Sequence, residues 1–192
     1  IIAPPVFGFK NTAKYWPAYD MAKAKSLLKE AGYPNGFSTN ITIPGGFYLK
    51  DRDVNEYIKA KLSEIGIDLE IRYLAPASAW PVLDSTNFEL FFAGWASVNM
   101  DGDMALYRNF HSANTREGFS NSVVDSMLDI GRKSGDSEVR KAAYLMAQIE
   151  LANTVIRYPL YHPNHIYGVN KRVINFKARS DEVYNLHSVS LR

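Results

Sequence analysis

Apolar side chains recur at helical spacing in the first third of the chain. Between residues 20 and 32 they fall on one face, with Asp20 before them as a good N-cap and Gly32 after them as a stop. A second run of the same kind extends from Val54 to Ile65 and ends at Gly66. These patterns predict two amphipathic helices in this part of the chain.

Other spacings predict strands around these helices. Residues 39–43 alternate between apolar and polar side chains, and residues 67–73 alternate more clearly than any other stretch. A short helix is predicted over 77–83. Residues 88–95 are apolar almost throughout, which is typical of a central strand that is covered on both faces.

The second half of the chain is predicted to be mainly helical. Helices are expected over about 101–110 and 122–131, and a longer helix is expected to begin after a cap at Asp136 or Ser137. Residues 155–169 predict a strand that two prolines interrupt.

This order of elements indicates a fold class. Because helices alternate with strands through most of the chain, we expect an α/β sandwich with a mixed, mostly parallel sheet. Residues 1–19 carry three prolines and predict an extended lead-in, whereas residues 177–192 are polar and weakly patterned. The start of the chain, with two isoleucines and no initiator methionine, is read as the middle of a longer protein.

Composition excludes several classes of function. The chain has 192 residues, 46% of them apolar, which suffices for one domain with its own core. The net charge is +2, and no basic stripe suggests a nucleic-acid partner. No apolar run approaches the roughly 18 residues of a membrane-spanning helix. Without cysteine, thiolate metal sites and cysteine nucleophiles are excluded.

The candidates for catalysis are few. Asp101 and Asp103 form an Asp-x-Asp pair, and one hypothesis is therefore a metal-dependent transferase that uses both carboxylates. The alternative is a helix cap with a partner for the helix dipole, which we favour. His162 and His165 flank a proline in a strand-like segment, where positions three apart face opposite sides. The two histidines are therefore not expected to bind one metal ion together. We therefore predict a protein that is not an enzyme, with no catalytic residue, no metal and no cofactor.

A more informative segment follows the apolar run at 88–95. It ends in Gly94 and Trp95 and leads through a loop into the helix after Asp101. Ligands of open α/β sheets bind beyond the carboxyl ends of strands. Trp95 is therefore either one wall of a binding site or a core residue.

Four groups of residues, in order, resemble one protein family, the dipeptide-, oligopeptide-, glutathione- and nickel-binding proteins of ABC importers. The groups are Tyr19-Asp20 to Phe37, Gly94-Trp95 with Asp101, Asp103 and Phe110-His111-Ser112, Gly118-Phe119-Ser120-Asn121 to Ile149, and Tyr158-Pro159-Leu160-Tyr161 with Val169 to Val173. The resemblance implies one lobe of a type II periplasmic-binding-protein fold, built as a three-layer sandwich.

The resemblance also implies partners and a location. The whole of residues 1–192 would be a C-terminal lobe, the N-terminal lobe would be missing, and the tail at about 177–192 would belong to that missing lobe. The two lobes close on a peptide-like solute and present it to the membrane subunits of an importer. The location is then periplasmic or extracellular, and the full-length protein is expected to be membrane-tethered.

The same resemblance implies a set of ligand-binding residues. Peptide-binding members carry an Asp three residues after the Trp, where it holds the peptide α-amine, but here that position is Val98. This favours glutathione-type, opine, glycoside or metal-chelate solutes over simple peptides. The expected ligand-binding residues are Trp95, Val98, Asn99, Asp101, Phe47, Tyr48, Arg52 and Tyr161. For Arg52 the alternative is a surface arginine paired with a local Asp.

Overall fold

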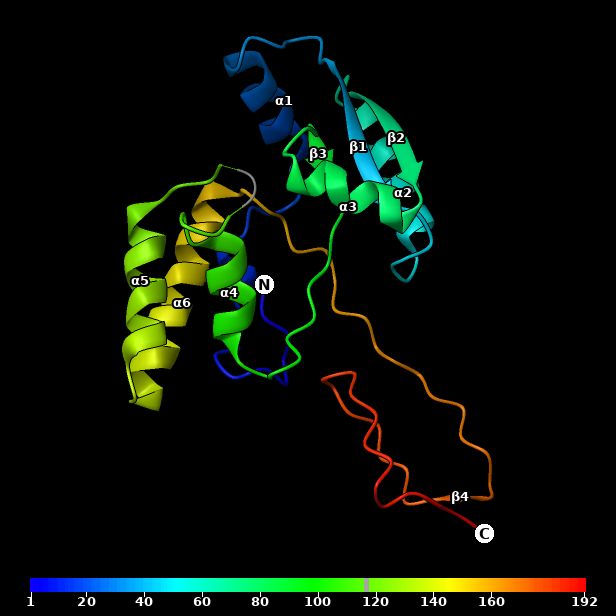
Figure 1. Cartoon of the computed structure of the whole chain (residues 1–192). Helices are drawn as coiled ribbons and strands as arrows, with labels where there is room; N and C mark the ends of the chain where they lie inside the picture. The colour runs from blue at the N-terminus through cyan, green and yellow to red at the C-terminus, as the bar shows by residue number, and fades with distance from the viewer. Residues whose placement is uncertain (116–117) are drawn as a thin grey trace. The chain divides into compact units, whose positions relative to one another are not determined.

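The computed structural model of the chain describes residues 1–115 and 118–192. These residues form two compact units (Figure 1). One unit is continuous, from Pro17 to Gly94, and the other combines Ile1–Trp16 with Trp95–Arg192. We call them the sheet unit and the helical unit.

The sheet unit alternates helices and strands. Its elements are α1 (Met21–Glu30), β1 (Ser38–Pro44), α2 (Asp51–Ser63), β2 (Asp68–Leu74), α3 (Pro76–Asp84) and β3 (Leu90–Phe91). The three strands are parallel and lie in the order β2-β1-β3. The pairing of β1 with β2 runs from Ser38 opposite Asp68 to Pro44 opposite Leu74.

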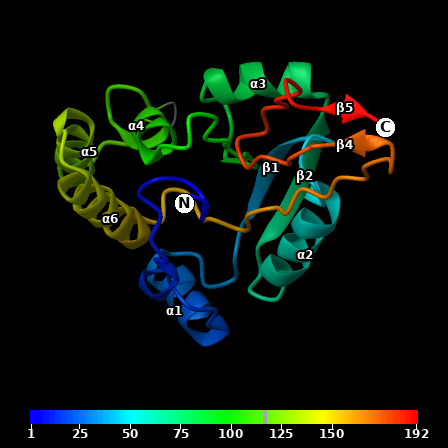
Figure 2. The same ribbon diagram turned by 90° about the horizontal axis from the view of Figure 1, so that it is seen from below.

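The core of the sheet unit lies around the central strand β1. The buried side chains of Ile41, Ile43, Leu69 and Phe92 form it, and apolar side chains of α2 pack against them. The last four residues of β1 are all buried, which requires cover on both faces of the strand. Figures 1 and 2 show α2 and α3 on opposite sides of the sheet. The predicted α/β fold with a mostly parallel sheet between helices is confirmed.

One strand prediction in this unit was wrong. Residues 88–95 were expected to form a central strand, but β3 spans two residues and lies at the edge of the sheet. Leu90 is exposed, and only Phe92, just after the strand, is buried. An apolar run predicts that its side chains are shielded from water, but it does not say which element shields them. Here the ring of Phe91 packs against the rings of Trp80 and Phe88 and not within a central strand.

The described residues of the helical unit form three packed α-helices. Its elements are a 3₁₀ helix (Ala13–Tyr15), α4 (Gly102–Phe110), α5 (Ser122–Lys133), α6 (Ser137–Thr154), β4 (Val173–Ile174) and β5 (Ser190–Leu191). Its core comprises buried residues of all three α-helices, including Leu106, Leu128, Tyr144 and Leu151. In Figure 2, α5 and α6 lie side by side.

The predicted helix starts are confirmed by their caps. Asp20 accepts a hydrogen bond from the Lys23 backbone N–H at 2.9 Å. Asp136 accepts hydrogen bonds from the first turn of α6 in the same way. A side-chain oxygen before the first turn satisfies N–H groups that have no partner inside the helix, which is why these positions can be recognised from sequence.

The predicted lead-in at the start of the chain contributes to the helical unit's core. Ile2 and Val6 are buried there. Phe7 donates its backbone N–H to the Met100 carbonyl, and its own carbonyl accepts from Gly102, both at 2.9 Å. This segment thereby fixes the loop that leads into α4.

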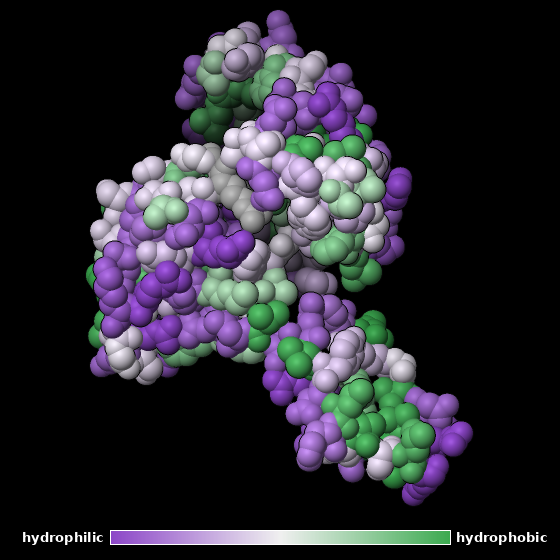
Figure 3. Space-filling view, in the orientation of Figure 1, coloured by the Kyte–Doolittle hydropathy of each residue, from purple (hydrophilic) through white to green (hydrophobic). Residues whose placement is uncertain are grey.

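The C-terminal segment departs from the prediction. Residues 155–169 contain no strand, since their prolines remove hydrogen-bond donors and no neighbouring strand of the described residues pairs with them. The short strands β4 and β5 pair antiparallel, and exposed apolar side chains gather on this segment (Figure 3). They include Ile166, Val169, Ile174, Val183, Tyr184, Leu186 and Leu191.

Among the described residues, no helix has both the length and the apolar character needed to cross a bilayer.

Candidate functional site

The N-terminus of α4 is held by Asp101. Its side chain accepts a hydrogen bond from the Asp103 backbone N–H at 2.9 Å, which caps the helix. Both of its carboxylate oxygens also accept from Arg140 of α6, at 2.8 and 2.9 Å. Arg140 further donates to the carbonyl of Gly131 at 2.9 Å and to the hydroxyl of Tyr144 at 3.0 Å. Asp101 is therefore a structural acid that joins α4 to α6.

The second acid of the pair is engaged as well. Arg132 of α5 donates two hydrogen bonds to Asp103, at 3.0 and 2.7 Å. Its guanidinium also lies over the Tyr107 ring, 3.3 Å from the ring centre, and the hydrogen bonds to Asp103 raise the pKa of Arg132. No group of three potential metal ligands occurs among the described residues. The metal-dependent transferase hypothesis therefore gains no support, because arginines hold both carboxylates.

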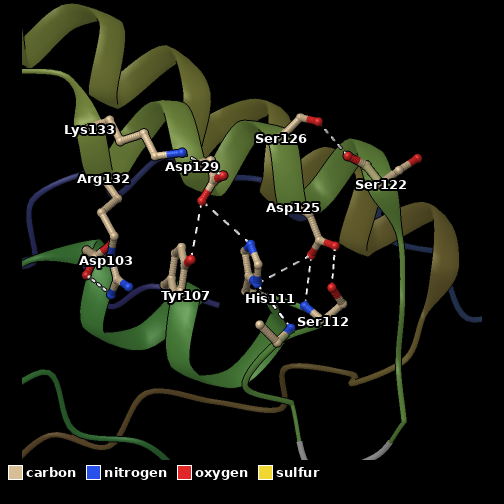
Figure 4. A network of polar contacts seen from close by, with 11 residues as sticks. Asp103, Tyr107, His111, Ser112, Ser122, Asp125, Ser126, Asp129, Arg132 and Lys133 are labelled. Atoms are coloured by element: carbon tan, nitrogen blue, oxygen red, sulfur yellow. Dashed lines mark hydrogen bonds and ion pairs between the residues drawn. The ribbon is translucent and has the colours of Figure 1, made fainter.

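A polar network continues from Arg132 along α4 and α5 (Figure 4). The rings of Tyr107 and His111 stack, with centres 4.2 Å apart and planes at 15°. Asp129 accepts from Lys133 at 2.9 Å and from the Tyr107 hydroxyl at 3.3 Å, and it lies 3.6 Å from His111 Nε2. These partners, Lys133 above all, lower the pKa of Asp129. The network connects the two helices through side chains spaced one turn apart.

A hollow of about 300 Å³ lies beside this network. We call it the Arg108 hollow, and it is lined by Asn99, Asp103, Met104, Tyr107, Arg108, Asn114 and Arg132. Of the ligand-binding residues predicted from the sequence, Asn99 lines the Arg108 hollow. The Asn99 side-chain oxygen accepts from the Asp101 backbone N–H at 3.1 Å, so its amide group is held in place.

Trp95 lies at the surface of the helical unit. It is 43% exposed, so the interpretation as a buried core residue is wrong. The Arg108 guanidinium lies over its ring, 5.5 Å from the centre. Val98 is exposed too and presents an apolar side chain where the resemblance would place a carboxylate. Tyr161 is also exposed, in the segment that lacks the predicted strand.

The three other predicted residues belong to the sheet unit. Phe47 and Tyr48 pack edge to face with centres 5.0 Å apart, and Phe47 contacts Trp80 in the same way at 5.2 Å. The Tyr48 ring lies against Gly94, where an added Cβ would be 2.7 Å from Tyr48 Cε1. The glycine before Trp95 is therefore needed for this ring packing. Phe47 itself is more than half exposed.

Arg52 lies against an aromatic ring and not against an acid of the described residues. Its guanidinium lies over the Tyr73 ring, 4.4 Å from the centre, and no carboxylate of the described residues pairs with it. The alternative of a surface arginine bonded to a local Asp is therefore wrong. The buried Asp51 instead accepts from the backbone N–H groups of Gly46 and Arg52, at 2.5 and 2.7 Å, and so holds the loop before α2.

The predicted residues do not all fall in one unit. Phe47, Tyr48 and Arg52 lie in the sheet unit, and the other five lie in the helical unit. The sequence patterns did not indicate Arg108 or the network of Tyr107, His111 and Asp129. A signal existed for part of it, since Tyr107 and His111, and Asp129 and Lys133, are pairs four apart at the C-terminal ends of the predicted helices. The guanidinium of Arg108, which pairs with no carboxylate of the described residues, had no such signal.

Comparison with known proteins adds an independent observation. The family model for bacterial extracellular solute-binding proteins, family 5 Middle, matches residues 1–117. The glutathione-binding protein GsiB of Escherichia coli K12 is 25% identical over 202 aligned residues, which cover all of this chain and 39% of that protein. The chain thus spans about two fifths of the length of the curated relatives it matches.

Solved structures of binding proteins are similar to the chain as well. The periplasmic binding protein DppA of Helicobacter pylori, in complex with the peptide STSA, has a TM-score of 0.69 and 29% identity, covering 78% of this chain and 30% of that one. The dipeptide-binding protein of Pseudoalteromonas sp. SM9913, in complex with Met-Leu, has a TM-score of 0.77 and 22% identity. It covers 99% of this chain and 39% of its own length, and it bears on the fold alone.

Proposed function

Since the chain belongs to the bacterial extracellular solute-binding proteins of family 5, we propose that it forms part of a protein that captures a peptide-like solute for an ABC-type importer. The observation that carries the proposal is the family match over residues 1–117. The exposed indole of Trp95, four residues after the end of β3, agrees with it.

Two observations support a class of solute, namely the ligands of the relatives and the apolar side chain of Val98. The E. coli relative is a glutathione-binding protein, and the H. pylori structure holds a peptide. An α-amine placed against Val98 would lose its hydrogen-bonding partner, which is costly in a closed site. We therefore place glutathione-type peptides, opines and glycosides ahead of simple dipeptides.

The partners and location are part of the same proposal. The chain would act as one lobe, with an N-terminal lobe supplied by the rest of the protein and the membrane subunits of an importer as its docking partner. The exposed apolar side chains of the C-terminal segment support assigning residues 177–192 to that other lobe. A periplasmic or extracellular, membrane-tethered protein would fit this role.

We further propose that the protein is not catalytic. Asp101 and Asp103 hold helices together through Arg140 and Arg132, so neither carboxylate is available as a base or metal ligand. Trp95, Val98, Asn99 and Tyr161 are proposed as ligand contacts in the helical unit. Phe47, Tyr48 and Arg52 are proposed for the sheet unit, each set to be tested by its own variants. For Asp101 we propose that it positions the loop.

Nuclear magnetic resonance of the chain tests the proposal, because its three tryptophans give separate indole signals. Glutathione should shift the Trp95 indole signal saturably, with a dissociation constant on the order of millimolar, since only part of the pocket is present. The Trp16 signal is the internal control, because that ring packs on Tyr158 in the same unit.

The variant Trp95→Ala should lose the response of the Asn99 side-chain signal. If no peptide, opine or glycoside shifts Trp95 or Asn99, the proposed function is wrong for this chain. Equal shifts of Trp16 and Trp95 would show nonspecific binding and would also contradict it.

A further inference from the structure

The charges that line the Arg108 hollow do not cancel. Three of its seven lining residues are charged, namely Asp103, Arg108 and Arg132. Asp103 and Arg132 neutralise one another through two hydrogen bonds. One positive charge remains, and it belongs to Arg108.

Arg108 is free to bind a ligand. It is exposed, and no carboxylate of the described part of the chain pairs with it. Its contact is with the Trp95 ring, over which the guanidinium lies. A ring beneath the guanidinium leaves its N–H groups, which lie in the guanidinium plane, available to an acceptor.

Two neutral donors lie on the same wall. The Asn99 amide is oriented because its oxygen accepts from the Asp101 backbone N–H, which leaves the NH₂ group without a partner among the described residues. Asn114 uses its backbone N–H to bond the His111 carbonyl at 2.8 Å, and its side-chain amide has no partner in the same set. The hollow thus offers one cationic and two neutral sources of N–H donors.

We propose that the Arg108 hollow binds a carboxylate group of the captured solute, with Arg108 as the charged partner and the amides of Asn99 and Asn114 as flanking donors. This inference rests on the proposed function and deepens it by naming a chemical group of the solute. A carboxylate fits because it is planar, carries one negative charge and accepts parallel hydrogen bonds from a guanidinium.

The hollow is poorly suited to other groups. A solute ammonium would meet an uncompensated cation, and a neutral group would leave that charge without a partner. A dianionic phosphate would exceed the single positive charge that remains. The volume of about 300 Å³ admits a carboxylate together with the atoms that carry it.

The test uses small probes that contain one such group. Isotope-labelled chain is titrated with N-acetylglycine, with its neutral analogue N-acetylglycinamide and with inorganic phosphate. The signals followed are Arg108 Nε–H, the side-chain amides of Asn99 and Asn114, and the Trp95 indole. We expect saturable shifts with N-acetylglycine and none with the amide.

The variants Arg108→Gln and Lys25→Gln each remove one positive charge, the first at the hollow and the second at a control position. Arg108→Gln should weaken N-acetylglycine binding at least about tenfold, as expected when a charged hydrogen-bonding partner is lost. Lys25→Gln, on α1, should leave it unchanged because Lys25 is exposed and does not line the hollow. If Arg108→Gln does not fold, Arg108→Lys replaces it and should bind more weakly than the parent, because an ammonium lacks the planar fork.

Three results would overturn the inference. They are equal shifts with the amide, shifts with phosphate alone, and unchanged binding in the Arg108 variant. Each is distinguishable from failure of the proposed function. Glutathione binding at Trp95 without N-acetylglycine binding would overturn only the carboxylate assignment. N-acetylglycine binding at Arg108 with no response to any peptide, opine or glycoside would overturn only the proposed function.

Discussion

Arg140 joins three elements of the helical unit through a single side chain. It bonds Asp101 at the start of α4, the Gly131 carbonyl in α5 and the Tyr144 hydroxyl in its own helix. The ion pair is about three quarters buried on both sides, so solvent screens it less than an ion pair on the open surface. Removing the guanidinium would leave a carboxylate, a carbonyl and a hydroxyl with fewer partners.

We therefore expect Arg140→Met to lower the free energy of unfolding by about 1.5–3 kcal/mol. Urea denaturation followed by circular dichroism measures the change. The neighbouring variant Lys141→Met is the control, because its exposed ion pair with Glu138 and its position 5.7 Å from the Phe7 ring centre together contribute at most about 1 kcal/mol. Equal losses in the two variants would mean that the Arg140 contacts do not stabilise the fold.

For single residues, the sequence predicted a local role such as a helix cap better than it predicted which distant side chain the residue contacts. The cap at Asp101 was expected from its place before a helical pattern, and it is present. The arginine that bonds it lies 39 positions further along the chain. No local pattern encodes such a contact. Arg52 shows the converse, since nearby acids suggested an ion pair, whereas the side chain lies on Tyr73, 21 residues away by number.

The packing of α5 against α6 depends on a glycine. Gly131 is buried within α5, and an added Cβ would overlap the ring of the fully buried Tyr144. Alanine would normally stabilise a helix interior by about 1 kcal/mol relative to glycine. Overpacking of a core ring costs about 1–3 kcal/mol, and here the ring is also held at its hydroxyl by Arg140. The packing term therefore outweighs the helix propensity.

Gly131→Ala should lower the midpoint of thermal unfolding by several degrees, corresponding to a net loss of up to about 2 kcal/mol. Gly135→Ala is the matched control, because an added Cβ at that position meets no atom within 4 Å. The control should be neutral or slightly stabilising. A stabilised Gly131→Ala variant would contradict the packing described for Tyr144.

Helices were predicted more reliably than strands. α1, α2, α4, α5 and α6 follow from apolar spacing and from capping residues, which are local signals. β1 and β2 alternate clearly and were also recognised. β3 and residues 155–169 were wrong because a strand requires a partner, and apolar composition does not say whether one is present.

At the scale of the whole molecule, the division into two compact units was not anticipated. The helical unit combines residues from both ends of the sequence, and no composition shift marks its boundary at Trp95. The α/β class and the family could be recognised because their signals are spread along the chain. The candidate site was harder to predict, because its residues belong to different units. The spacing of residues along the sequence does not indicate which of these side chains are in contact.

We propose that this chain supplies one part of a solute-binding pocket and needs the rest of such a protein to bind well. The direct test is calorimetric titration of glutathione into the chain and into a chimera. In the chimera, residues 1–192 replace the matched stretch of the E. coli glutathione-binding protein, and a cooperative melting transition confirms folding. We predict binding at least about 100-fold tighter in the chimera, a difference of about 2.7 kcal/mol, and weaker binding in its Trp95→Ala variant. Submicromolar binding by the chain alone, or a folded chimera that binds no better than the chain, would contradict the claim.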